Sequence, residues 1–103
     1  MWRSVEVRLA GDHPAARGHF PSNPIIPGAL LLDEVVKAIA EVDGRRGEIT
    51  IRVAKFFRPV RPGDQMRVQW QPLREAAVTF ECRLVGSEGL AVSGTLEIGP
   101  TRP

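Results

Sequence analysis

Residues 18–36 read GHFPSNPIIPGALLLDEVV, a proline-rich segment that runs directly into a series of apolar residues. The apolar series continues to about residue 42, with Pro27 just before it and Gly44 just beyond it. Proline is favoured at the start of a helix, and glycine is favoured directly after its end. The sequence therefore predicts one long helix over residues 28–42.

The predicted helix carries a single polar stripe. Glu34, Lys37 and Glu41 recur at helical spacing, and most of the other positions are Ala, Leu, Val or Ile. A helix that is apolar over most of its circumference is usually buried on several sides. We therefore expect this helix to lie at the centre of the protein.

Five segments alternate apolar and polar residues, as strands with one buried face do. They cover residues 4–9, 48–54, 66–71, 77–85 and 90–98. The residues expected to face inward are Val5, Val7 and Leu9; Ile49, Ile51 and Val53; Met66, Val68 and Trp70; Val78, Phe80, Cys82 and Leu84; and Leu90, Val92, Leu96 and Ile98. Gly94, on the apolar side of the last strand, indicates a bulge or a close approach by the helix.

The simplest fold for these elements is of the α+β class. It is a curved antiparallel sheet of about five strands wrapped around one central helix. The free edges of such a sheet and the remaining apolar surface favour a dimer. The length of 103 residues predicts a single domain over residues 1–103.

Composition limits the classes of function. The single cysteine, Cys82, cannot form an internal disulfide, which fits a reducing compartment. No stretch is apolar enough for a signal peptide or a membrane span, so we expect a cytoplasmic protein without membrane insertion. The net charge is +2, the basic residues are scattered, and the aromatic residues mostly occupy positions expected to face inward. This pattern argues against nucleic-acid binding, whereas a mild positive charge suits an acidic protein partner.

Asp33 stands beside the polar stripe, and three of its four neighbours at i±3 and i±4 are apolar. Burial of this carboxyl group would raise its pKa and make it a usable proton donor near neutral pH. On a partly exposed face, Asp33 would instead pair with Lys37 at i+4 and add slightly to the stability of the helix. The position of Asp33 leaves both interpretations open.

Two further elements lie close to Asp33 in the sequence. His19 precedes three prolines at three-residue spacing, which stiffen the loop and can hold a side chain still; an ordinary surface histidine is the alternative. The backbone N–H of Gly28, at the positive end of the helix, could bind an oxyanion; an ordinary helix start is the alternative. Together these residues offer an imidazole base, a carboxylic acid and free backbone donors, and no spacing of metal ligands is present.

The stretch from Gly18 to Val36 resembles the active-site segment of the bacterial 3-hydroxyacyl-(acyl carrier protein) dehydratases. The pattern of that family is H-F-P-x-x-P-x-x-P-G-x-x-x-x-(E or D), and its histidine-to-acid interval of fourteen residues equals that from His19 to Asp33. A second stretch, KFFRPVRPGDQM over residues 55–66, resembles the strand-and-turn segment of the same family. The resemblance implies the hot-dog fold and a homodimer or higher homo-oligomer. In such dimers the histidine of one subunit and the acid of the other share a site.

The implied reaction is the reversible dehydration of (3R)-3-hydroxyacyl thioesters to trans-2-enoyl thioesters, in fatty-acid or related lipid and polyene synthesis. The substrate is carried on the phosphopantetheine arm of acyl carrier protein, and no other cofactor and no metal is implied. His19 would remove the proton next to the thioester carbonyl, and the Gly28 N–H would stabilise the enolate-like oxygen. Asp33 would protonate the departing 3-hydroxyl group.

The resemblance also suggests residues for the acyl chain and for the carrier. Phe20, Pro27, Leu31 and Phe57 are candidate walls of an acyl tunnel, with ordinary core packing as the alternative for Leu31. Acyl carrier protein is acidic, so Arg58 and Arg61 are candidate docking residues, with a solvated surface as the alternative.

The chain departs from the usual pattern of the family at three positions. The acid is Asp33, as in the branch that also isomerises the double bond, and Ser22 replaces a glycine. Lys37 stands where glutamine is usual, and a cation at that position favours the ionised form of the acid. The LLLDEV version of the motif resembles small dehydratases of specialised pathways such as aryl polyene assembly. Two alternative functions stay open. The chain could be a hot-dog acyl thioesterase, or a non-catalytic protein that binds acyl thioesters or acyl carriers.

Overall fold

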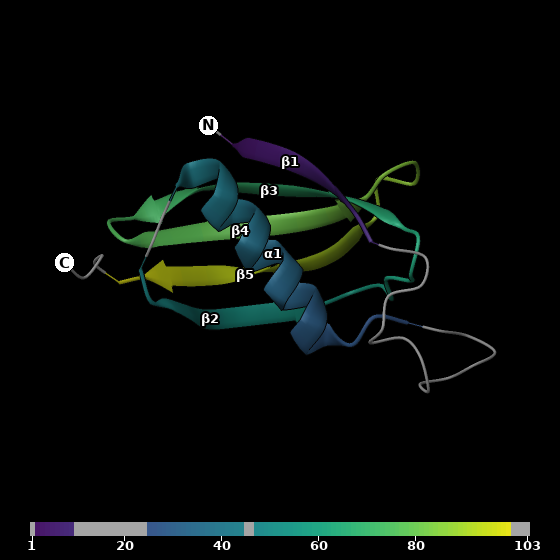
Figure 1. Ribbon diagram of the computed structural model, residues 1–103, viewed down its shortest axis with the longest axis horizontal. Helices are drawn as coiled ribbons and strands as arrows, with labels where there is room; N and C mark the ends of the chain where they lie inside the picture. The colour runs from purple at the N-terminus through teal and green to yellow at the C-terminus, as the bar shows by residue number, and fades with distance from the viewer. Residues whose placement is uncertain (1, 10–24, 45–46, 100–103) are drawn as a thin grey trace.

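The computed structural model describes residues 2–9, 25–44 and 47–99. These residues form β1 (Arg3–Arg8), α1 (Gly28–Asp43), β2 (Ile49–Phe56), β3 (Gln65–Arg74), β4 (Ala77–Leu84) and β5 (Leu90–Ile98). All neighbouring strands pair antiparallel in one sheet, in the order β1-β3-β4-β5-β2 (Figure 1). The predicted α+β architecture of five strands and one helix is therefore confirmed, with the ends of each element shifted by a few residues at most.

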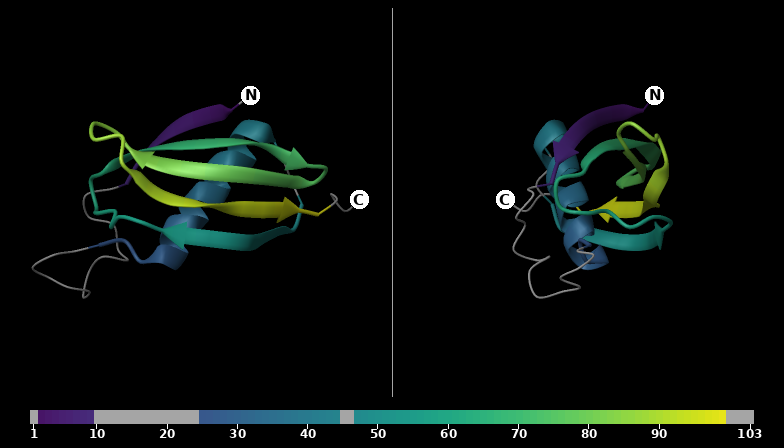
Figure 2. Two further views of the ribbon diagram at one scale, coloured as in Figure 1. Left: turned by 180° about the vertical axis from the view of Figure 1, so that it is seen from behind. Right: turned by 90° about the vertical axis from the view of Figure 1, so that its right-hand side faces the viewer.

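Helix α1 crosses one face of the sheet, which curves around it (Figures 1 and 2). Its buried residues recur at helical spacing and face the sheet: Leu31, Val35, Ala38 and Ile39. Among the described residues nothing covers the opposite side of α1, so within them the expectation of a helix buried on several sides is wrong. Leu30 and Val42 on α1 are each about 40% exposed. Within the described residues, no helix has the length and apolar character needed to cross a bilayer.

The inner face of the sheet and the buried face of α1 form the core. Its largest fully buried side chains are Trp70, Phe80, Leu9, Ile39 and Met66. The expectation that most aromatic residues face inward is wrong for the single chain. Trp2, Phe56 and Phe57 are each at least 40% exposed, whereas only Trp70 and Phe80 among the described aromatic residues are buried.

Irregular pairing moves two of the predicted inward residues. Ile51 pairs with Leu96 and Val53 pairs with Thr95, so the register shifts by one residue between them. Because a bulge reverses the alternation of faces, Val53 lies on the outer side of β2, contrary to the prediction. A second shift, on β5, places Leu90 opposite Arg83 rather than in the inward set.

Gly94 marks a close approach, as predicted, but the partner is not the helix. A Cβ on Gly94 would come within 2.0 Å of the Val53 carbonyl oxygen and 2.9 Å of the Phe80 ring. The register shift in β2 lies directly opposite this part of β5. Only glycine therefore lets the bulged edge strand and the core aromatic residue come together at this point.

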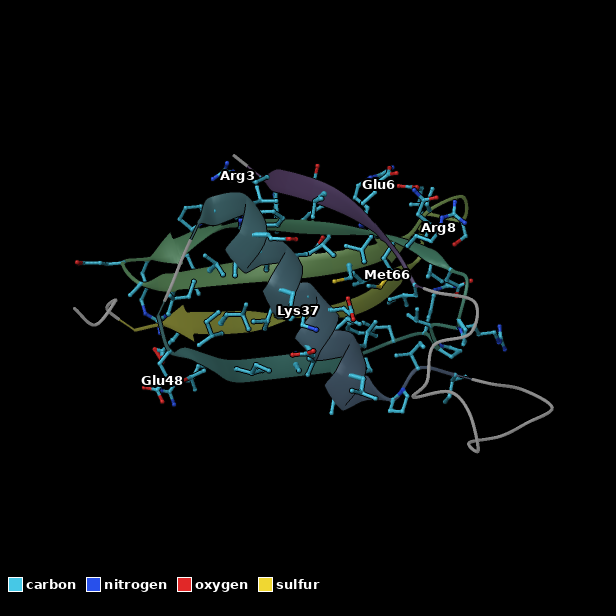
Figure 3. The ribbon with its side chains drawn as sticks, in the orientation of Figure 1. Arg3, Glu6, Arg8, Lys37, Glu48 and Met66 are labelled. Carbon is cyan, nitrogen blue, oxygen red and sulfur yellow. The ribbon has the colours of Figure 1, made fainter. Side chains whose placement is uncertain are left out.

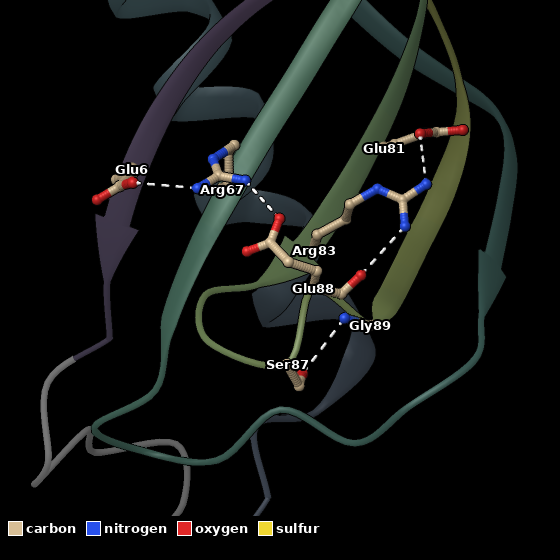
Figure 4. A network of polar contacts seen from close by, with 7 residues as sticks. All are labelled: Glu6, Arg67, Glu81, Arg83, Ser87, Glu88 and Gly89. Carbon is tan, nitrogen blue, oxygen red and sulfur yellow. Dashed lines mark hydrogen bonds and ion pairs between the residues drawn. The ribbon is translucent and has the colours of Figure 1, made fainter.

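The outer face of the sheet carries ion pairs (Figure 4). Arg67 contacts Glu88 at 2.6 Å and Glu6 at 3.6 Å, which links β3 to the β4–β5 turn and to β1. Arg83 pairs with Glu81 at 3.2 Å and donates to the backbone carbonyl of Glu88 at the same distance. This face is the wet side predicted by the alternating pattern.

Candidate active site

A mostly apolar groove of about 400 Å³ lies beside the first turn of α1. Gly28 and Leu31 line it from the helix, and Phe56, Phe57 and Arg58 line it from the end of β2 and the segment that follows. We call it the Gly28 groove. Four residues that the sequence assigned to substrate or partner contacts are thus brought together: Gly28, Leu31, Phe57 and Arg58.

Two backbone hydrogen bonds hold the wall of the Gly28 groove in place. The N–H of Ile26 donates to the Val60 carbonyl oxygen at 2.8 Å, which ties the residues before α1 to the segment after β2. The N–H of Phe57 donates to the Ala91 carbonyl oxygen, also at 2.8 Å. The groove is therefore built on sheet and helix ends rather than on side chains alone.

The first residue of α1 offers a backbone donor to the Gly28 groove. The Pro27 carbonyl oxygen accepts hydrogen bonds from the N–H groups of Leu30 and Leu31 at 3.1 and 3.0 Å. No side chain caps the helix start, and among the described residues nothing accepts a hydrogen bond from the Gly28 N–H. Such a free N–H at the positive end of a helix suits a developing negative charge. Pro27, a predicted substrate contact, lies outside the groove lining and serves the helix start instead.

The ring of Phe56 fills the space beside Gly28. A Cβ on Gly28 would lie 2.9 Å from Phe56 Cζ and 3.1 Å from Cε1. A half-exposed aromatic ring therefore occupies the space beside the proposed backbone donor. Phe56 was not among the predicted site residues, although it directly precedes Phe57 in the KFFRPV motif.

The two predicted tunnel residues in the groove differ in burial. Leu31 is 2% exposed and belongs to the core, so the alternative of core packing is confirmed alongside its place in the groove wall. Phe57 is 55% exposed and is not among the residues that form the core or pack against it. An apolar surface left open in this way is typical of a ligand or partner contact.

Asp33 lies on the outward side of α1, outside the lining of the Gly28 groove. Its side chain is 55% exposed, and its Oδ2 lies 3.1 Å from Lys37 Nζ. Of the two interpretations left open by the sequence, the structure shows the exposed i,i+4 pair; a buried carboxyl group is wrong for the single chain. The hydrogen bond and charge of Asp33, followed by the charge of Glu34, raise the pKa of Lys37 above its usual 10.5.

The remaining predicted residues of the loop before α1 lie outside the described residues. These are His19 and Phe20, together with the motif positions Pro21, Ser22 and Pro24. Their assigned roles therefore stay predictions that rest on the sequence.

The two arginines predicted to dock a carrier differ in position. Arg58 lines the Gly28 groove and packs over the β4–β5 turn, where a Cβ on Gly89 would lie 2.6 Å from Arg58 Nε. Arg61 is exposed at the start of the RPGD turn, outside the groove. Its N–H donates to Asp64 Oδ2 at 2.8 Å, and the Gly63 N–H of the same turn donates to the Leu9 carbonyl oxygen.

Curated relatives of the chain are dehydratases. The 3-hydroxyacyl-(acyl carrier protein) dehydratase FabZ of Bartonella bacilliformis is 40% identical over 93 residues, which cover 80% of this chain and 60% of the relative. FabZ of Haemophilus influenzae is 34% identical over 83 residues, which cover 72% of this chain and 56% of the relative. The chain thus spans less than two thirds of the length of these relatives.

Solved structures share its fold. The dehydratase heterocomplex ApeI:P from Xenorhabdus doucetiae matches with a TM-score of 0.76 and 22% identity, over 96% of this chain and 88% of that one. An N-terminal dehydratase from the difficidin assembly line matches with a TM-score of 0.79 and 17% identity, over 100% of this chain and 40% of that one. A 1,4-dihydroxy-2-naphthoyl-CoA thioesterase from Synechocystis matches with a TM-score of 0.67 and 12% identity, over 100% of this chain and 85% of that one. The predicted hot-dog fold is therefore confirmed, and the fold alone does not separate dehydratase from thioesterase.

The family model gives the assignment that the fold alone cannot. The model described as "ApeI-like: ApeI dehydratase" matches residues 3–95, which include both stretches that resemble the dehydratases. The matched region also contains all the described residues that line the Gly28 groove, together with Asp33 and Lys37. This chain belongs to the ApeI-like dehydratase family.

Proposed function

We propose that the chain is a hydro-lyase that reversibly dehydrates (3R)-3-hydroxyacyl thioesters to trans-2-enoyl thioesters, in fatty-acid or related lipid and polyene synthesis. The observation that carries this proposal is the Gly28 groove. It sets the Gly28 N–H, for which the described residues offer no acceptor, against apolar walls in a chain of a dehydratase family. The names of its FabZ relatives support a substrate on acyl carrier protein.

The groove suits the chemistry of dehydration. The Gly28 N–H would bind the thioester oxygen, which gains negative charge as His19 removes the proton from the neighbouring carbon. The electron pair of that C–H bond forms the new double bond, and the C–O bond to the 3-hydroxyl group breaks. Asp33 would give that oxygen a proton, so that it leaves as water. The apolar surfaces of Leu31, Phe56 and Phe57 would hold the acyl chain.

A second subunit would complete the site. Asp33 does not line the Gly28 groove of its own chain, which supports a site shared between subunits. β2 is an edge strand, and Ile51, Val53 and Phe56 expose large apolar side chains along it. An apolar unpaired edge is a natural place for a second strand to pair. We therefore propose a homodimer, or a higher homo-oligomer, joined along β2.

The size of the purified assembly tests this arrangement. Sedimentation of the purified chain should give a dimer or a multiple of it, and Ile51→Lys on β2 should yield monomers. Leu73→Lys is the matched control, because Leu73 is another exposed apolar residue but lies near the end of β3. A monomeric native chain would contradict the homodimer. The name of the Xenorhabdus heterocomplex would then direct the search to a related partner chain.

The proposed carrier is acidic, and the groove rim is basic. Arg58 lines the groove and Arg61 lies in the exposed turn nearby in sequence, so both would face an acyl carrier protein whose phosphopantetheine arm enters the groove. No cofactor beyond that arm is proposed. The buried free thiol of Cys82 supports a cytoplasmic location, where thiols stay reduced.

Hydration of a short trans-2-enoyl thioester on acyl carrier protein tests the function. The loss of absorbance of the conjugated enoyl group would be followed with the native chain, His19→Ala and Asp33→Asn. We expect the native chain to form the 3-hydroxyacyl thioester, and each variant to lose at least about 100-fold in rate while remaining folded.

The same assay separates the alternatives. Release of the free carrier thiol would identify an acyl thioesterase. Binding of the acyl carrier without turnover, and unaffected by His19→Ala, would identify a non-catalytic binding protein. Either result would contradict the proposed dehydratase.

A further inference from the structure

The side chain of Arg58 lies over the β4–β5 turn (residues 85–89), where Gly89 leaves room for it. A Cβ on Gly89 would lie 2.6 Å from Arg58 Nε, 2.9 Å from Cζ and 3.0 Å from Cδ. Non-bonded heavy atoms attract each other best at about 3.5–4.0 Å and repel at these shorter distances. The Arg58 side chain therefore occupies the space that a side chain at residue 89 would take.

Glycine is needed at residue 89 for this space and not for the backbone conformation. Gly86 of the same turn has a φ of 103°, which other residues rarely adopt. Gly89 is not among the described glycines with a positive φ. Alanine would therefore fit the backbone at residue 89, and its methyl group would meet the guanidinium end of Arg58.

Hydrogen bonds and an ion pair fix the β4–β5 turn at this contact (Figure 4). The Leu84 N–H donates to the Gly89 carbonyl oxygen at 3.0 Å, and the Gly89 N–H donates to Ser87 Oγ at 3.2 Å. Arg67 of the neighbouring strand β3 binds the Glu88 carboxylate at 2.6 Å. A methyl group at residue 89 would therefore displace the flexible Arg58 side chain rather than the turn.

The Arg58 side chain is placed at the groove by packing. Arg58 is exposed and lines the Gly28 groove, and the N–H of its neighbour Phe57 donates to the Ala91 carbonyl oxygen on β5. Among the described residues no carboxylate pairs with Arg58. Four arginines on the strands do pair with carboxylates: Arg52, Arg67, Arg74 and Arg83. As far as the described residues go, the turn holds Arg58 and its guanidinium group can bind an anionic partner.

We propose that Gly89 is a positioning residue for carrier recognition, which keeps the Arg58 guanidinium group at the rim of the Gly28 groove. This inference rests on the proposed function, in which Arg58 faces the acidic acyl carrier protein. Ordering a long side chain on binding costs free energy, so a guanidinium group already held by packing binds its partner more tightly than a mobile one. Gly89 itself touches neither the carrier nor the substrate and acts through Arg58.

Isothermal titration with acyl carrier protein that bears its phosphopantetheine arm tests the role of Gly89 without turnover. We expect Gly89→Ala to raise Kd about threefold at low salt, and this rise should shrink as salt screens the charges. Arg58→Ala should raise Kd at least as much. In the Arg58→Ala background, Gly89→Ala should cause no further rise, because the atoms that meet the methyl group are gone.

Gly99→Ala is the matched control and should leave Kd unchanged. A Cβ on Gly99 would meet no described atom closer than 3.4 Å. The Gly99 N–H donates to the carbonyl oxygen of Glu48, which lies at the opposite end of the sheet from the β4–β5 turn (Figures 1 and 3).

Hydration kinetics separate this role from general damage to the fold. Gly89→Ala should raise KM for an enoyl thioester on the carrier by the same factor of about three, and it should leave kcat/KM for a short carrier-free thioester unchanged. Equal losses with both substrates, or a further loss in the Arg58→Ala background, would overturn the proposal. An unchanged affinity of Gly89→Ala for the carrier would overturn it as well.

Failure of the proposed function gives a different result. A native chain that binds the carrier through Arg58 and Gly89 but does not hydrate the enoyl thioester would contradict the dehydratase and leave the role of Gly89 intact. A native chain without affinity for the carrier would overturn both the role of Gly89 and the carrier-bound substrate.

Discussion

The ring of Phe56, at the end of β2, lies against Gly28, the first residue of α1. A Cβ on Gly28 would come within 2.9 Å of Phe56 Cζ. The residue whose N–H we assign to the thioester oxygen and the aromatic wall of the groove are therefore packed side by side, with no room for a side chain between them. The identity of residue 28 and the position of this ring depend on each other.

Gly28→Ala should preserve the fold and impair the site. The clash falls on the far end of a half-exposed side chain, which can turn aside, so we expect the melting temperature to change by only a few degrees. The displaced ring would narrow the groove, and we expect kcat/KM for enoyl hydration to fall by about 10- to 100-fold. Thermal unfolding and hydration kinetics check the two parts.

A double-mutant cycle that combines Gly28→Ala with Phe56→Ala tests whether the ring causes the expected loss of activity. If the added methyl group acts through the ring, Gly28→Ala should cost much less activity when residue 56 is already alanine. An equal loss in both backgrounds would show that the ring is not the mediator.

Asp43 should be the most important carboxylate for stability on α1. Its Oδ2 accepts a hydrogen bond from the buried Trp70 indole at 3.0 Å, and its Oδ1 lies 2.5 Å from Arg3 Nη1. Asp43→Ala leaves the indole N–H without this acceptor, and we expect the free energy of unfolding in urea to fall by about 2 kcal/mol. Glu41→Ala, at an exposed position two residues earlier, should change it by at most about 0.5 kcal/mol. Equal losses in the two variants would contradict the assigned role of Asp43.

Cys82 should be unreactive in the folded protein. Burial, together with the charge of Glu81, raises the pKa of this thiol to about 12, so almost no thiolate exists at pH 8. We expect a thiol-specific disulfide reagent to react only after denaturant unfolds the chain. Rapid labelling of the native protein would contradict the burial of this thiol.

The raised pKa of Cys82 also makes the stability of the protein fall with pH in the alkaline range. The thiol has a pKa of 9.0 in the unfolded chain, and the folded protein keeps the thiol protonated at pH values above this. The contribution of Cys82 to stability is therefore complete below pH 9 and is lost as the pH rises from about 9 toward 12. Cys82→Ala should weaken this alkaline loss in urea unfolding, and an unchanged pH dependence would exclude Cys82 as its cause.

Arg58 should affect the carrier more than the chemistry. Arg58→Glu reverses a charge at the rim of the groove, and we expect KM for a carrier-bound substrate to rise about fivefold at low salt. The rise should shrink as salt screens the interaction, and it should be absent for a short thioester without carrier. Arg74→Glu, at the opposite end of the sheet from Arg58, is the control. Equal effects of the two variants would exclude a docking role for Arg58.

The sequence predicted the elements because their patterns are local. The alternation of Val78, Phe80 and Cys82 and the helical spacing of Leu31, Val35 and Ile39 match the buried faces that the structure shows. The bulge that turns Val53 outward was missed, because it depends on the pairing of β2 with β5 and not on the segment itself. Gly94 was the local sign of that irregularity.

The site was only partly predictable for the same reason. Gly28 was identified from its place at the helix start, and Leu31, Phe57 and Arg58 through a resemblance; the structure brings all four to one groove. The contact of Phe56 with Gly28 joins residues that are far apart in the chain, so no local pattern could show it. The exposure of Asp33 depends on which side of α1 the sheet covers, and the sequence left that choice open.

Activity in a hybrid dimer tests the central claim, that two copies of the chain complete one site. His19→Ala and Asp33→Asn would be co-expressed with different affinity tags, and the hybrid carrying both tags would be purified. Each pure variant should be inactive in enoyl hydration, whereas the hybrid retains one intact site of two and should show about half of the native activity. A hybrid as inactive as the two pure variants would contradict a site shared between subunits.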